Sequence, residues 1–230
     1  MGRGLTLSED GAEHIPSALC PTILTDISTA LASQSSDRAG TRLFALAGLQ
    51  RFLQADGAIG SIATFRLGVA VRAVRAILFD KTLATNWALP WHQDRTIAVR
   101  QKIEVDGFGP WSRKQGVLHV EPPSELLARM LTLRLHLDPV DADNAPLLIA
   151  PGSHRLGRLA EPDIPAVVAR CGSHACLAEV GDGWIYATAI LHASEAAAQP
   201  RRRRVLQIDF AAEDLPGGLE WLGLNANLDV

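Results

Sequence analysis

One segment of the chain, LTLRLHLD at residues 131–138, alternates strictly between apolar and polar side chains. Successive side chains of a strand point to opposite faces of a sheet, so the four leucines share one face. On the other face lie Thr132, Arg134, His136 and Asp138. The apolar face must pack into a core, and the polar face must meet water, a ligand or a polar cavity. The segment therefore predicts a sheet with one polar side.

Helical and extended patterns occupy different parts of the chain. Apolar residues recur at three- and four-residue spacing through ILTDISTALASQ and TRLFALAGLQRFLQA, which predicts a helical layer over about residues 20–70. Short alternating runs separated by turn clusters follow, and these predict a sheet core over about 73–211. Residues 1–18 are polar and without a period, so we expect a flexible arm, with 19–230 as one domain. This order favours a mainly β chain of the α+β class, an antiparallel barrel or double-sheet jelly roll with N-terminal helices packed outside.

Charge and composition argue against several kinds of partner. The net charge of −3 gives the chain as a whole no attraction to nucleic acid or to an anionic membrane. We find no apolar run long enough to span a bilayer and no signal peptide, so we expect no membrane partner and a cytoplasmic protein. The 3 cysteines fit a reducing compartment, and CGSHAC lacks the second ligand pair of a structural zinc site. The basic stretch RRRR at 201–204 has no interleaved aromatic residues, which favours a solvated strand entrance over a nucleic-acid site.

The stretch WHQD at 91–94 places a histidine and an aspartate two positions apart. On a strand, His92 and Asp94 point to the same side and could share a metal ion with a third ligand from elsewhere. Two imidazoles and one carboxylate leave three open positions, the arrangement of non-haem Fe(II) oxygenases. His136 and Asp138 have the same spacing. For either pair the alternative is a hydrogen-bonded polar couple on a sheet, and spacing alone does not separate the two interpretations.

Five stretches in a fixed order favour the pair His92 and Asp94 over the pair His136 and Asp138 as metal ligands. They are WHQD, NAPLLIAPGSHRLGRL, GDGW, LHAS and RRRRVLQIDF. Together, over roughly residues 75–211, they resemble the phytanoyl-CoA dioxygenase family of Fe(II)- and 2-oxoglutarate-dependent oxygenases. The resemblance implies a double-stranded β-helix, which is the cupin-like form of the jelly roll. It also implies Fe(II), 2-oxoglutarate and O2 as cofactors.

The resemblance also implies roles for individual residues. His92 and Asp94 match the first two iron ligands of the family, and His192 in LHAS matches the distal one. Arg203 matches the arginine that binds the far carboxylate of 2-oxoglutarate, and Ser194 matches a serine that assists it.

The final strand supports this choice of arginine within limits. Arg203 and Gln207 share one face of the strand, while Leu206 and Phe210 share the face that should pack against the helices. A guanidinium suits a carboxylate because it donates two parallel hydrogen bonds. Arg201 has the same parity as Arg203, so only the family spacing distinguishes them.

Several further residues are weaker candidates. Gln93 and Asn86 lie beside or before the first ligand, where the family gathers cosubstrate contacts, and Lys81 has the same potential role. Possible substrate contacts are Arg134, His136 and Trp111, although a network that steadies the site is an equal alternative for the first two.

The resemblance implies an enzyme that hydroxylates an unactivated C–H bond of a small molecule and releases succinate and CO2. Relatives that halogenate generally replace the carboxylate with a small residue, and Asp94 retains it. The alternatives are a catalytically silent jelly roll that binds a small ligand and an interaction module that uses the arginine cluster. The sequence selects neither a substrate nor an oligomeric state.

Overall fold

A computed structural model describes residues 4–34, 38, 40–45 and 47–225. Within this part of the chain the strands form three antiparallel sheets. The largest has the strand order β1 (Ala12–Ile15), β11 (Gly183–Ala187), β8 (Leu131–His136), β13 (Arg203–Ala211), β3 (Arg72–Lys81) and β2 (Gly40–Arg42). The second has the order β10 (His174–Cys176), β9 (Leu147–Ile149), β12 (His192–Ser194) and β4 (Leu89–His92). The third joins β5 (Ile97–Ala98), β7 (Val117–Val120) and β6 (Trp111–Lys114).

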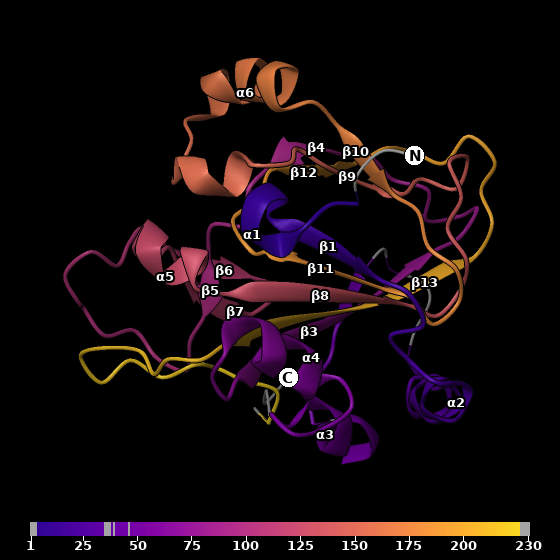
Figure 1. Cartoon of the computed structure of the whole chain (residues 1–230). Helices are drawn as coiled ribbons and strands as arrows, with labels where there is room; N and C mark the ends of the chain where they lie inside the picture. The colour runs from indigo at the N-terminus through magenta and orange to yellow at the C-terminus, as the bar shows by residue number, and fades with distance from the viewer. Residues whose placement is uncertain (1–3, 35–37, 39, 46, 226–230) are drawn as a thin grey trace.

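The helices lie outside the sheets. In Figure 1, α2 (Pro21–Ala30), α3 (Ala47–Leu53) and α4 (Gly60–Leu67) lie below the six-stranded sheet, and the four-stranded sheet lies above it. On the far side of the four-stranded sheet is α6 (Ile164–Cys171). The remaining short helices are α1 (Leu7–Asp10), α5 (Ser124–Ala128) and the 3-10 turns at Ser153–Leu156 and Glu161–Asp163. The jelly roll with N-terminal helices outside it is confirmed.

The alternating segment explains why the six-stranded sheet divides its two faces so sharply. Leu133 and Leu135 of β8 are fully buried in the main core, together with Ile208 and Phe210 of β13. Buried side chains of the helical layer complete this core, among them Ile27, Leu49, Phe52 and Ile59. The polar side chains of β8 consequently point the other way, into the space between the two large sheets.

The expectation of a flexible arm over residues 1–18 is wrong for its described part. Residues 12–15 form β1, which pairs with β11 from Ala12↔Tyr186 to Ile15↔Gly183. The His14 ring stacks on Trp184 with centroids 4.9 Å apart. The edge of β11 needs backbone partners, and a segment as short as β1 shows no period that a sequence pattern could reveal.

No helix in the described ranges is long and apolar enough to cross a membrane.

Candidate metal centre and its two cavities

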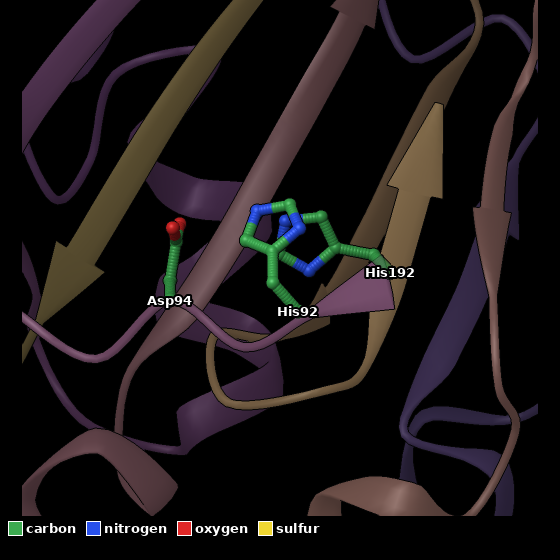
Figure 2. A group of neighbouring side chains, drawn as sticks. All are labelled: His92, Asp94 and His192. Carbon is green, nitrogen blue, oxygen red and sulfur yellow. The ribbon is translucent and has the colours of Figure 1, made fainter. Parts of the chain in front are cut away.

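Two histidines far apart in the sequence lie side by side in the four-stranded sheet. β4 and β12 are antiparallel neighbours, and His92 is the register partner of His192. The ring centroids of the two imidazoles are 4.3 Å apart. Asp94 follows β4 and points to the same side, as Figure 2 shows. One ligand atom from each of the three side chains lies within 4.8 Å of the others, and no other such group of three or more occurs in the described part of the chain.

Both imidazoles are held in the tautomer that a metal needs. Nδ1 of His92 lies 2.8 Å from the Pro90 carbonyl, and Nδ1 of His192 lies 3.0 Å from the Ile190 carbonyl. A carbonyl only accepts, so each Nδ1 carries the proton and each Nε2 keeps its lone pair. Burial lowers the pKa of His192 to about 4, so this ring is neutral at neutral pH.

The carboxylate of Asp94 is ionised and has a cationic neighbour. Nη2 of Arg75 donates to its Oδ2 at 2.6 Å. Burial opposes ionisation of Asp94, but the Arg75 guanidinium and then the two imidazoles outweigh it and hold its pKa well below the usual range. Two imidazoles and one anionic carboxylate on one side of a point suit a divalent cation and leave positions open for other ligands.

A cavity of about 580 Å³, the inner cavity, runs from these three residues into the space between the sheets. Its lining combines Arg134 of β8 and Arg203 of β13 with apolar side chains such as Phe79. Arg203 is 2% exposed and donates to the Ala145 carbonyl, while its Nε has no partner. Arg134 donates to Oε1 of Gln207 at 2.7 Å, and its Nε also lacks a partner. Burial and the charge of Arg134 lower the pKa of Arg203 to about 9. Both effects destabilise the charged guanidinium, and a bound anion would stabilise it.

A third buried cation, Lys81, is the last residue of β3, the strand beside β13. Lys81 is 1% exposed and donates to the Glu195 carbonyl at 2.7 Å, with Oγ of Ser194 at 3.4 Å. Its Nζ lies 4.8 Å from the centre of the Trp87 ring. Burial, followed by the charges of Arg203 and Arg134, lowers the pKa of Lys81 to about 8. Within the described residues no carboxylate pairs with any of these three cations, so the inner cavity is suited to an anion.

The arginine cluster at 201–204 divides between ion pairs and the inner cavity. Arg201 pairs with Asp141, Arg202 with Asp80 at 2.8 Å, and Arg204 with Asp138 at 2.7 Å. Arg203 is the member of the cluster that reaches the inner cavity. The contact with Arg204 also occupies Asp138, so His136 and Asp138 do not converge on a common site.

A second, open groove of about 1970 Å³ reaches two members of the candidate metal cluster, His92 and Asp94. One wall is apolar and consists of Trp91 with Ile164, Pro165, Val168 and Ala169 of the α6 segment. The facing wall is polar and includes Thr96, Lys114, His119 and Glu121. His92, Asp94 and Arg75 line both the groove and the inner cavity, so the candidate metal centre lies where the two meet.

The structure moves four weaker candidates away from these roles. The Gln93 amide donates to the Gly157 and Ala189 carbonyls and accepts from the Leu159 N–H, so it anchors loops instead of reaching the inner cavity. The Asn86 side chain forms a two-point clamp on the backbone of Ala197.

The other two are on the candidate substrate side. Trp111 lies on β6 and packs against an apolar cluster that includes Val120, and it lines neither the groove nor the inner cavity. His136 is 2% exposed and lines neither space, and burial lowers its pKa to about 3. Arg134 does line the inner cavity, so of the three substrate candidates it alone lies at the site.

Sequence reasoning missed Arg75, which contacts Asp94 directly. The alternation of Arg75, Ile77, Phe79 and Lys81 along AVRAVRAILFDK could have placed it on the interior face. Its proximity to Asp94 depends on how separate strands are arranged in space.

Comparison with known proteins gives a family and a fold. A model of the phytanoyl-CoA dioxygenase family (PhyH) matches residues 8–205. The solved structure of EctD from S. alaskensis with 2-oxoglutarate and 5-hydroxyectoine has a TM-score of 0.66 and 19% identity, covering 90% of this chain and 73% of that one. The non-haem α-ketoglutarate-dependent epimerase SnoN from nogalamycin biosynthesis has a TM-score of 0.63 and 16% identity, covering 97% and 93%. Iron-bound HygX from Streptomyces hygroscopicus has a TM-score of 0.60 and 11% identity, covering 89% and 83%. No curated protein matches the chain.

Proposed function

The chain belongs to the phytanoyl-CoA dioxygenase family of Fe(II)- and 2-oxoglutarate-dependent oxygenases, and we propose that it hydroxylates an unactivated C–H bond of a small molecule. The cofactors of the family are Fe(II), 2-oxoglutarate and O2. One observation carries the proposal: the inner cavity, whose buried cations suit an anion, and the open groove meet at the candidate metal cluster of His92, Asp94 and His192. Bound iron would supply the oxidation, in which O2 and 2-oxoglutarate are consumed, one oxygen atom enters the substrate, and succinate and CO2 are released.

The protein's part in this reaction is to hold the groups in place. His92, Asp94 and His192 hold the metal through two Nε2 atoms and a carboxylate oxygen. Arg203 binds the far carboxylate of 2-oxoglutarate, assisted by the Ser194 hydroxyl. Arg134 and Lys81 add positive charge beside the same position, which favours a dicarboxylate over a neutral ligand.

The groove serves the substrate in this proposal. It opens to solvent, reaches the metal cluster without crossing the inner cavity, and has one apolar wall on α6. A substrate with an apolar face would rest on Val168 and Ala169 and present its C–H bond toward His92 and Asp94.

Hydroxylation is the specific reaction that we propose within the oxygenase chemistry of the family. SnoN, which shares the fold, is an epimerase, so the fold is compatible with several outcomes. A retained Asp94 carboxylate leaves no vacancy for a halide among the protein ligands, and this favours hydroxyl transfer over halogenation.

Anaerobic titration of the metal-free protein with Fe(II) and 2-oxoglutarate tests the assignment. We expect the visible charge-transfer band of the chelate in the wild type and in His136→Ala, because His136 lies outside the site. The band should be absent in His92→Ala, which removes a ligand. Loss of the band in His136→Ala with retention in His92→Ala would refute the ligand set. No band under any condition would favour a silent jelly roll that binds a small ligand.

A further inference from the structure

Arg75 bridges two carboxylates, and only one of them belongs to the candidate metal cluster. Its Nη2 donates to Oδ2 of Asp94 at 2.6 Å, and its Nε donates to Oδ2 of Asp209. Arg75 lies on β3 and Asp209 on β13, where the two are register partners. The bridge therefore starts from the most extensively paired strands of the six-stranded sheet and reaches across to the segment that follows β4.

The Asp209 carboxylate has a second hydrogen-bond donor besides Arg75. Asp209 is 4% exposed, and its Oδ1 accepts a hydrogen bond from the Thr132 hydroxyl at 3.1 Å. The Thr188 hydroxyl lies 3.1 Å from that of Thr132. Since the Thr132 proton goes to Asp209, Thr188 donates to Thr132. The carboxylate of Asp209 is thus held on one oxygen by Thr132 and on the other by Arg75.

Asp94 depends on this bridge for its orientation. It lies beyond the end of β4, and among the described residues Arg75 is the one hydrogen-bond donor to its carboxylate. The contact uses Oδ2 and leaves Oδ1 without a hydrogen-bond partner. A free oxygen beside two imidazoles is what a metal ligand requires.

An arginine in this place has an electrostatic disadvantage that Asp209 offsets. A guanidinium beside a ligand carboxylate repels an incoming cation and draws negative charge away from that carboxylate. The second carboxylate, that of Asp209, pairs with Nε of the same guanidinium and supplies a compensating negative charge. Arg75 can then orient Asp94 while the site as a whole still attracts a divalent metal.

We propose that Asp209 is a positioning residue for the metal centre, which acts through Arg75 to orient Asp94 and to preserve its negative charge for the metal. The inference rests on the proposed function, because it takes Asp94 as a ligand. Neither Asp209 nor Arg75 is a metal ligand in this assignment.

Co(II) binding to the metal-free protein tests the proposal without turnover. Asp209→Asn keeps the shape and removes the charge, so we expect Co(II) affinity to fall about tenfold or more, with a changed visible ligand-field spectrum. In an Arg75→Met background the same change should alter affinity by less than about threefold, because Asp209 acts through Arg75. Arg72→Met is the matched control: Arg72 lies on the same strand but pairs with Asp214 at the surface, so affinity and spectrum should stay unchanged.

The outcomes separate this inference from the proposed function. If the wild type fails to bind Co(II), the metal site itself is refuted. If the wild type binds and Asp209→Asn leaves affinity and spectrum unchanged, only the role of Asp209 is refuted, and equal losses in both backgrounds would refute its action through Arg75. Circular dichroism of the apo proteins establishes folding. Should Asp209→Asn not fold, Thr132→Val removes the supporting hydroxyl, and its Co(II) affinity and spectrum decide by the same criteria.

Discussion

The buried cations in and beside the inner cavity show how single residues prepare a site before any ligand is present. Lys81, Arg134 and Arg203 come from three adjacent strands. Burial and then the charges of Arg203 and Arg134 lower the pKa of Lys81, and burial and then the charge of Arg134 lower the pKa of Arg203. Buried charges without a partner of opposite charge lower the stability of a fold. Their arrangement is therefore best explained by an anionic ligand.

Lys81 should make 2-oxoglutarate binding dependent on pH. The pKa of Lys81 is about 8, so its ammonium is present at pH 7 and is lost as the pH rises through this value. The protonated form attracts the dicarboxylate, so affinity should be high below the pKa of the free protein and fall above it. Calorimetric titration of 2-oxoglutarate into Mn(II)-loaded protein between about pH 6.5 and 8.5, below the pKa of about 9 of Arg203, measures this. Lys81→Met should bind more weakly at pH 7 and lose most of the dependence; a profile identical to that of the wild type would contradict the role.

At the site, the sequence could predict the residues that stand in motifs. It could not predict the residues that contact them from other strands, such as Arg75. His92, Asp94 and His192 stand in quoted motifs, and Arg203 follows at a fixed spacing. The roles of Gln93 and Asn86 stay predictions: their side chains hydrogen-bond to loop backbone, because adjacency to a candidate ligand along the chain does not imply adjacency in the site. Arg75 was missed because it reaches Asp94 only once β3 and the end of β4 are packed together.

At the scale of elements, β13 contributes side chains to both the hydrophobic core and the candidate site. One face carries Arg203 and Gln207 into the inner cavity, and the other carries Leu206, Ile208 and Phe210 into the core under the helices. Period two makes this division predictable from the sequence. β1 was not predictable, because a short edge strand is decided by the partner whose backbone it satisfies.

Phe210→Ala should destabilise the fold far more than the same change at Phe65. Phe210 is 0% exposed in the main core, so its removal leaves a cavity and should lower the free energy of unfolding by about 3–5 kcal/mol. Phe65 on α4 is 81% exposed, and Phe65→Ala should change it by less than about 0.5 kcal/mol. Urea denaturation followed by circular dichroism measures both. Similar losses in the two variants would mean that the helical layer does not pack on β13 as described.

At the scale of the whole molecule, the site lies between the two large sheets. The metal cluster belongs to the four-stranded sheet and its continuation, whereas Arg75, Arg134 and Arg203 belong to the six-stranded sheet. A metal and a dicarboxylate bound together would contact both sheets, and the dicarboxylate would offset the charges of Lys81, Arg134 and Arg203, which have no carboxylate partner among the described residues. Occupation of the site should therefore stabilise the entire fold.

Occupation of the site should raise Tm by an amount that depends on His192 and not on His136. With Co(II) and 2-oxoglutarate each at about 100 times its dissociation constant, binding should add at least about 2.7 kcal/mol, or a rise of about 5–10 °C in Tm. His136→Ala should show the same rise, because His136 lines neither cavity. His192→Ala should lose most of it, because the variant lacks a ligand between the sheets. An equal rise in both variants would place the stabilising site elsewhere, whereas a difference between them would tie the stability of the jelly roll to the metal centre that it surrounds.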